Sequence, residues 1–409
     1  MTGAAMERAI SPITGKANTE FIARYNPSVT SDTRVVDGPV DNWLCLDTGL
    51  VFNSTGTRGQ EIAFYEHQYD LHKYDLKSGR RTLSQLMYFD QGVAKSVYDN
   101  IVEFVHQGAA LPATGRALDV GCGNGLLLSS FDRSRPGWQL HGVEPSRNAA
   151  AFFAEVMPQF KVFEGGFHQS PFVKETFDMV FAEGVLEHVR DPMLFLSAFR
   201  NCLREDGVGF IGIPNFETNP TDLLTFDHLS RFTADVIRGL FRPTGLEIVH
   251  EWVLSSRVPM WFLVRCSQPA KTCASWSMTD VRRLCWESMA MIDGMFRSYN
   301  RAASVSARDG GRVAIYGTGI VGFLGLRITD LTNNKVCAFI DDNSALWGTQ
   351  RAGIPVHSPA DIRLLDVRHI VLSANSCYHA ALVKRIRDAE ISPITIYLPG
   401  GDGERDIHS

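Results

Sequence analysis

The sequence lacks several features that would assign its class at once. None of its apolar runs approaches the roughly 20 residues that a membrane-spanning helix needs, and the first residues lack the apolar core of a signal peptide. Its eight cysteines include no CxxC pair, which fits reduced thiols better than a disulfide framework. No cluster of lysine and arginine is present, and the formal net charge is −5. We therefore expect a cytoplasmic protein that binds neither membranes nor nucleic acid.

The content of hydrophobic residues is typical of a folded domain. The 409 residues are 44% hydrophobic and 21% charged, as in a soluble globular protein. A chain of this length is too long for one typical domain, so we expect two or three domains, each with its own core.

Residues 116–125 carry the most informative motif. They combine a short apolar strand that ends in an acid with a glycine-rich turn that leaves room for a ligand against the backbone; these residues are Asp119, Gly121, Gly123 and Gly125. About 19 residues after Gly125, a second short strand ends in Glu144, the position at which such folds hydrogen-bond a ribose. Glycines at every other position differ from the dinucleotide fingerprint and fit a cofactor without a pyrophosphate. The two strands together predict a nucleoside-binding site.

Strand and helix signals then alternate to about residue 253. We expect strands at residues 117–120, 139–143, 179–182, 207–213 and 247–254, and helices near 84–107, 146–157, 191–203 and 233–243. Such alternation predicts an α/β fold with a mostly parallel sheet that helices cover on both faces.

A second α/β pattern follows a long helix that we expect over about residues 278–305. Residues 312–322 form a strand, a GxGxxG turn and a helix start, and the next strand ends in acids at 341–342. Later strands are expected at 369–373 and 395–398. Gly317, Gly319 and Asp341 are candidate contacts for a nucleotide part of the substrate or for a second cofactor. Because a lone GxGxxG is a weak signal, a fold kept for substrate enclosure or dimer contacts is an equal alternative.

Residues 118–125, 143–146 and 177–188 resemble the successive motifs of class I S-adenosylmethionine-dependent methyltransferases. The resemblance implies S-adenosylmethionine as cofactor, with Glu144 on the ribose and the methionine moiety over the glycine turn. It also implies adenine contacts from the loop with Gly166 and Phe167, and contacts from the strand end at Ala182 and Glu183. From the residues alone, helix capping by the two acids and core packing of Phe167 are the alternatives.

Beyond that domain, the chain is similar to the sugar C-methyltransferase family. Residues 11–15 and 45–52 look like the two halves of that family's zinc ribbon, but the ligand positions hold Ser11, Thr14, Cys45 and Thr48. One thiolate is too few for tetrahedral zinc, so we expect no metal. The C-terminal landmarks are residues 316–322, 340–343 and 353–356. We expect a loop-rich N-terminal domain at 1–85, a methyltransferase domain at 86–265, a bridging segment at 266–309 and a Rossmann-like domain at 310–409.

Candidate acid-base residues follow the same resemblance. Residues 225–232 fall where the family carries a Tyr-His-Glu-His-Leu-Ser-Tyr-Phe stretch, and they keep Asp227 and His228 but hold Thr225 and Phe226 at the tyrosine and first histidine positions. An oxygen or nitrogen acceptor, which needs no enolate stabilisation, suits this pair better than a carbon acceptor. His188 is a further catalytic candidate. A packing role in a loop is the alternative for both histidines.

Tyr65, with Tyr69, Tyr74 and nearby histidines, is a candidate lid over the substrate, or the inward face of an amphipathic helix. Asn215, after the strand at 207–213, is a further candidate substrate contact. We expect a methyltransferase for a small molecule, with a nucleotide-linked sugar or an antibiotic-type bacterial secondary metabolite as acceptor, and a homodimer as a possible assembly. The alternatives are an NAD-dependent nucleotide-sugar oxidoreductase and a non-catalytic binding module.

Overall fold

The computed structural model describes residues 7–32, 34–67, 87–90, 93–174, 176–253, 259–270, 277–331, 335–374, 378–388, 394–398 and 407–408. They divide into two compact units. The first comprises Met1–Ile22, Asp41–Thr218 and Asp227–Asp280, and the second comprises Ala23–Val40, Asn219–Phe226 and Val281–Ser409, each to the extent described. Among these residues, no helix combines the length and apolar character that a membrane span requires.

A seven-stranded sheet forms the centre of the first unit. Its order is β10-β9-β8-β11-β12-β15-β14, in which the first five strands are parallel and β15 is antiparallel to both neighbours. The bounds are β8 (Arg116–Val120), β9 (Gln139–Glu144), β10 (Lys161–Glu164), β11 (Phe177–Glu183), β12 (Leu203–Pro214), β14 (Leu246–Trp252) and β15 (Pro259–Cys266). Successive strands are added on one side of β8 up to β10 and on its other side from β11 onward. Ligands of such sheets bind at the carboxyl ends of the strands beside this switch point, which here are β8 and β11.

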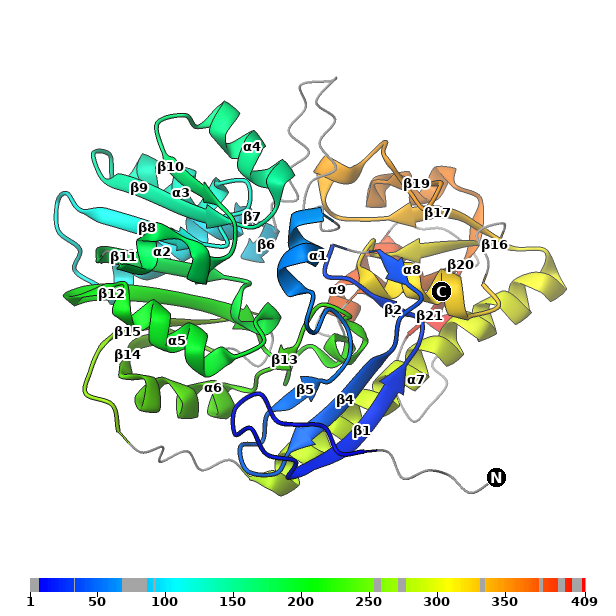
Figure 1. Cartoon of the computed structure of the whole chain (residues 1–409). Coiled ribbons are helices and arrows are strands. Elements are labelled where there is room, and N and C mark those ends of the chain that lie inside the picture. The colour runs from blue at the N-terminus through cyan, green and yellow to red at the C-terminus, as the bar shows by residue number, and fades with distance from the viewer. Residues whose placement is uncertain are drawn as a thin grey trace. The chain divides into compact units, whose positions relative to one another are not determined.

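Helices cover both faces of this sheet (Figure 1). They are α2 (Val97–Gly108), α3 (Leu126–Ser134), α4 (Arg147–Val156), α5 (Pro192–Asn201) and α6 (Ala234–Phe241). One buried cluster joins the apolar sides of α5 and α6 to one sheet face, and a second joins α2 and α3 to the other. Asp191 and Thr233 begin α5 and α6 by accepting hydrogen bonds from backbone N–H groups of the first turn. The predicted doubly wound α/β fold is therefore confirmed.

Two expectations about this unit are wrong in detail. The helix expected over residues 84–107 begins only at Val97, because β6 (Met87–Asp90) and β7 (Val93–Ser96) pair as an antiparallel hairpin before it; residues 84–86 lie outside the described residues. A glycine at position 92 interrupts the helical pattern there. β15 was not expected, because a strand buried on both faces is a continuous apolar run without the alternation that reveals other strands.

The N-terminal segment contains a small four-stranded sheet as well as loops. The order of the sheet is β1-β4-β5-β13, with bounds β1 (Thr19–Tyr25), β4 (Val40–Cys45), β5 (Val51–Asn53) and β13 (Ser230–Arg231). Strand β5 is antiparallel to both of its neighbours. Strand β13 comes from far along the chain and pairs with β5, and the Asn53 N–H donates to the Leu229 carbonyl oxygen at 3.0 Å. The sheet thus fixes the backbone directly after His228.

The second unit contains its own α/β sheet in the order β18-β19-β17-β16-β20-β21-β22. The strands from β19 to β21 are parallel, and the outer two are antiparallel additions. The bounds are α7 (Met278–Asp309), β16 (Arg312–Tyr316), α8 (Ile320–Ile328), β17 (Val336–Ile340), β18 (Gln350–Arg351), β19 (Ile354–His357), β20 (Val367–Leu372), α9 (His379–Asp388), β21 (Thr395–Tyr397) and β22 (Ile407–His408). The hairpin of β2 (Ser28–Val29) and β3 (Val35–Val36) lies against α8 in this unit. The second predicted Rossmann-like sheet is confirmed.

Candidate active site

The turn after β8 is held open by its glycines. Gly121, Gly123 and Gly125 all have positive φ angles, of 72°, 53° and 76°, which other residues adopt only with strain. A Cβ on Gly121 would lie 2.6 Å from Cγ2 of Val185, so no side chain fits at this position. The turn leads directly into α3. The N-terminus of this helix therefore lies next to the end of β8, where a ligand can approach it.

Glu144 at the end of β9 closes this turn from the side. Its Oε2 accepts a hydrogen bond from the Gly123 N–H at 2.8 Å, and its Oε1 accepts one from the Ser146 N–H at 2.7 Å. The carboxylate therefore lies against the glycine turn. Its contact with a ribose stays a prediction. Asp119, one residue before the end of β8, is buried beside it.

Burial raises the pKa of three carboxyl groups along this sheet edge. Burial, followed by the charge of Glu144, raises the pKa of Asp119 to about 8. Burial raises the pKa of Glu144 to about 7, although its hydrogen bonds from Ser146 and Gly123 oppose the shift. For Glu183 at the end of β11, burial and then the charges of Glu187 and Asp119 raise the pKa to about 8. Buried carboxyl groups with raised pKa values favour a ligand that carries positive charge.

A glycine on the next strand makes room for Glu183. Gly212 on β12 pairs with Glu183 in the sheet, and a Cβ on Gly212 would lie 1.6 Å from Glu183 Oε2. The carboxylate can thus occupy this position only beside glycine. The sequence points to Glu183 as a candidate but not to Gly212. The one indication for Gly212 is that it is a glycine inside a predicted strand.

The other predicted cofactor residues lie near the same edge. Ala182 is buried on β11. Gly166 precedes a short 3-10 helix, Phe167–Gln169, and its N–H donates to Gln169 Oε1 at 3.0 Å. The Phe167 ring is buried and lies 5.5 Å from the Phe195 ring, so it packs in the core. Adenine contacts from this loop remain a prediction.

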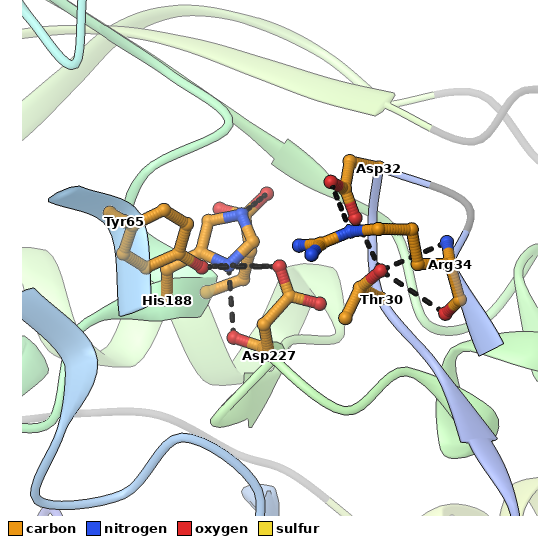
Figure 2. A network of polar contacts seen from close by, with 7 residues as sticks. Thr30, Asp32, Arg34, Tyr65, His188 and Asp227 are labelled. Carbon is orange, nitrogen blue, oxygen red and sulfur yellow. Dashed lines mark hydrogen bonds and ion pairs between the residues drawn. The ribbon is translucent and has the colours of Figure 1, made fainter. Parts of the chain in front are cut away.

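A group of polar side chains lies directly after β11, where His188 ends the short 3-10 helix Leu186–His188 (Figure 2). His188 Nδ1 lies 2.6 Å from the Tyr65 hydroxyl oxygen and 2.9 Å from the Asp227 carbonyl oxygen. The Tyr65 hydroxyl donates to Asp227 Oδ2 at 3.2 Å. Since a carbonyl oxygen only accepts, we assign a ring proton of His188 to Nδ1.

His228 completes this group. Its ring packs edge-on against the His188 ring, with 4.7 Å between the ring centroids, and both His228 and Asp227 are buried. The structure therefore brings the three catalytic candidates together and adds Tyr65 from α1 (Glu61–His67) as a direct hydrogen-bond partner. The sequence suggested a lid role or helix packing for Tyr65 but not this contact, because no local pattern links residues 123 positions apart. Tyr69, His72 and Tyr74 lie outside the described residues.

Asn215 follows β12 and is buried. Its Oδ1 accepts the Glu217 N–H at 3.0 Å, and its carbonyl oxygen accepts from Thr218. The side-chain oxygen thus shapes its own turn.

The second unit contains an acid and glycine turn of the same design. Asp341, after β17, accepts from the Thr318 N–H at 2.9 Å and from the Thr318 hydroxyl at 2.6 Å. Thr318 lies between Gly317 and Gly319, at the start of α8, and Gly317 has a φ of 106°. The three residues named for this unit are therefore together.

Comparison with known proteins finds a family match for the part of the chain that forms the seven-stranded sheet of the first unit. A family model described as a methyltransferase domain matches residues 93–251. An uncharacterized methyltransferase of Schizosaccharomyces pombe is 30% identical over 209 residues, which cover 48% of this chain and 73% of the relative. A ubiquinone biosynthesis O-methyltransferase of Nitrobacter winogradskyi is 38% identical over 96 residues, which cover 23% of this chain and 36% of the relative. The match thus spans little more than a third of that second relative.

Two solved structures are similar to about two fifths of the chain. A S-adenosylmethionine-dependent methyltransferase from Clostridium acetobutylicum has 13% identity and a TM-score of 0.35, with coverage of 42% of this chain and 90% of that chain. A methyltransferase of calicheamicin biosynthesis has 21% identity and a TM-score of 0.33, with coverage of 42% and 54%. From the matched domain and the 73% coverage of the yeast relative, we conclude that the chain belongs to the methyltransferase family.

Proposed function

We propose that this protein transfers a methyl group from S-adenosylmethionine to an oxygen or nitrogen of a small molecule. The observation that carries the proposal is the glycine turn closed by Glu144, with the buried carboxyls of Asp119 and Glu183 on the same sheet edge. Glu144 would bind the ribose, and the glycine turn would lie against the methionine moiety. When bound, the cofactor supplies an activated methyl on a sulfonium, and its positive charge suits these acids.

The polar group after β11 supports proton removal from the acceptor. His228 and His188 are in ring contact, and Asp227 and Tyr65 hold the His188 ring through Nδ1. In this assignment, His228 removes the acceptor proton, Asp227 supplies negative charge, and Tyr65 and His188 position the base. An oxygen or nitrogen acceptor loses only one proton, which this group can accept. Methyl transfer itself needs positioning more than covalent help.

For the acceptor we propose a nucleotide-linked sugar or a related bacterial secondary metabolite. Support comes from the second α/β unit, in which Asp341 closes the turn of Gly317 and Gly319 as Glu144 closes the first turn. Such turns at helix N-termini suit phosphate or ribose groups. In this scheme residues 86–265 carry the cofactor, residues 310–409 contribute to substrate binding, and the protein acts in the cytoplasm, with a homodimer as its proposed assembly.

The test combines cofactor affinity with turnover. Calorimetric titration with S-adenosylhomocysteine should show one site in the wild type. Methyl transfer from labelled S-adenosylmethionine is then measured against a panel of nucleotide sugars and hydroxylated aglycones. His228→Ala should keep its affinity for S-adenosylhomocysteine and lose turnover by about 100-fold or more. Lack of wild-type binding would refute the cofactor assignment, and unchanged turnover in His228→Ala would remove this residue from the mechanism.

A further inference from the structure

Two imidazoles and one carboxylate lie close together beside the Tyr65 and Asp227 contacts of His188. One ligand atom from each of Glu187, His188 and His228 lies within 4.8 Å of the other two. The residues Glu187 and His228 are 3% and 7% exposed, and the His188 side chain is 12% exposed. All three belong to the same compact unit, and His188 and Glu187 share one short 3-10 helix. The three groups are therefore held close together away from bulk water.

The orientation of the His188 ring provides a second observation. Its Nδ1 lies 2.9 Å from the Asp227 carbonyl oxygen, and its Nε2, on the other side of the ring, lies 3.9 Å from Glu187 Oε1. A nitrogen and a carboxylate oxygen at this separation can both reach one metal ion through bonds of about 2.0–2.2 Å. A hydrogen bond from the outer ring nitrogen to a backbone carbonyl is also the contact that metal-binding histidines almost always make.

We propose that Glu187, His188 and His228 bind one divalent transition-metal ion of the class that includes zinc, cobalt and iron. Two imidazole nitrogens with one carboxylate oxygen suit these ions, whereas magnesium and calcium prefer ligand sets made of oxygen. Three protein ligands leave coordination positions open, as in catalytic rather than structural sites. The buried carboxyl of Glu183 lies close enough to Glu187 for their charges to interact, and a bound dication would relieve this repulsion.

The consequence for the reaction rests on the proposed function. An acceptor hydroxyl that occupies an open position of the ion would lose its proton more easily, because a bound dication lowers the pKa of a coordinated oxygen. His228 would then be a ligand of the ion in place of the base role given above, and the hydroxyl proton would leave to water; only the methyl transfer from S-adenosylmethionine is kept from the proposed function. The metal site would thus favour an oxygen acceptor over a nitrogen acceptor.

The test uses the full chain after chelator treatment and dialysis. Cobalt(II) is titrated while its visible absorption is recorded, and bound zinc is counted by mass spectrometry after gel filtration. We expect one equivalent of either ion in the wild type. Glu187→Gln and His228→Ala should each weaken binding by about 10- to 100-fold. His168→Ala, at an exposed histidine of the same unit, is the matched control and should bind as the wild type does.

Binding of S-adenosylhomocysteine, measured for every variant in chelator, reports on folding and tests the proposed function separately. A wild type that binds this ligand but takes up no stoichiometric cobalt would overturn the metal site and leave the proposed function standing. Equal cobalt affinity in the wild type, Glu187→Gln and His228→Ala would also overturn it. Should His228→Ala lose its affinity for S-adenosylhomocysteine, Glu187→Gln, which preserves side-chain size, decides the comparison.

Discussion

Individual side chains set the charge of the cofactor edge. Both carboxylate oxygens of Glu144 accept hydrogen bonds from backbone N–H groups, whereas the buried carboxyls of Asp119 and Glu183 lie near other carboxylates. Removing charged groups from water without a cation is costly, so these acids bind protons more readily than exposed ones do. A ligand that brings a positive charge relieves this cost, and three predictions follow at the scale of single residues.

Replacing Glu144 tests the turn closure. Glu144→Gln keeps the shape but loses the charge and one acceptor oxygen, so affinity for S-adenosylhomocysteine should fall by about 10- to 100-fold, as for a lost hydrogen bond to a charged group. Calorimetric titration measures the change. Glu164→Gln, at an exposed acid on β10, is the control and should bind normally. Equal affinity in both variants would contradict the assignment of Glu144.

Cofactor affinity should depend on pH. The raised pKa values of Asp119, Glu144 and Glu183, near 7 to 8, mean that the folded protein without ligand holds protons that the unfolded chain has released above about pH 4. Stability without ligand therefore falls as pH rises from about 4 to 8, since the folded state binds more protons. A cationic ligand prefers the ionised acids, so its affinity should rise over pH 6 to 8.5.

Titrations with S-adenosylmethionine in buffers of different ionisation enthalpy should accordingly detect proton release on binding near pH 7. S-adenosylhomocysteine, which lacks the sulfonium charge, should show a shallower rise with pH. The same pH dependence for both ligands would argue against a direct role of the carboxylates in charge recognition.

Tyr65 should act through His188. Tyr65→Phe removes the hydroxyl that lies 2.6 Å from His188 Nδ1 and donates to Asp227, so turnover should fall by about 10-fold and the pH–rate profile should shift. Affinity for S-adenosylhomocysteine should not change. Tyr378→Phe, at a half-exposed tyrosine of the other unit, is the control. A loss of turnover without any change in the pH profile would indicate packing alone.

At the scale of elements, the register between β11 and β12 decides where Glu183 can lie. The register sets Glu183 opposite Gly212, and neighbouring pairs such as Ala182 with Ile211 fill the core between strands and helices. A one-residue slip would place a side chain against the carboxylate. The glycine is thus part of the site although it carries no chemistry.

Gly212→Ala should therefore destabilise the protein by about 1–3 kcal/mol through overpacking and displace Glu183. Denaturant unfolding measures the loss, and Gly319→Ala, which has open space around its Cβ and a negative φ, should change stability far less. The double variant Glu183→Ala/Gly212→Ala should recover most of the loss. Absence of such recovery would place the clash elsewhere.

Much of the fold and part of the site follow from the sequence. Strands β8, β9, β11 and β12 were predictable, because each has its own apolar run and turn residues, whereas the short and partly exposed β10 was not. The glycines and Glu144 were predictable from spacing alone. The contact of Tyr65 with His188 and the pairing of β13 with β5 were not, since each joins segments more than 100 residues apart. Tertiary pairing of this kind leaves no local pattern.

For the whole molecule, the two units have separate apolar clusters. Among the described residues, the clusters around the first sheet extend to Cys266 and those of the second unit begin at Met291. Units with their own hydrophobic cores behave as separate folding units. A ligand stabilises the unit that binds it.

Calorimetric scans should therefore show two transitions, only one of which moves with S-adenosylhomocysteine. Ligand at 100 times its dissociation constant adds about 2.7 kcal/mol to the unit that binds it, which corresponds to a shift of roughly 5–10 °C. The Glu144→Gln variant is the control, because the shift should shrink at the same ligand concentration. One transition that moves as a whole would contradict independent unfolding.

The pairing of β13 with β5 has a consequence for how the chemistry of this protein can change. The ladder fixes the main chain directly after His228, and the residues from Leu229 to Arg231 that form it are buried, so few other side chains fit there. Directed evolution of acceptor preference should therefore leave this short stretch unchanged, because a substitution that loosens the ladder would also displace the reactive groups beside it.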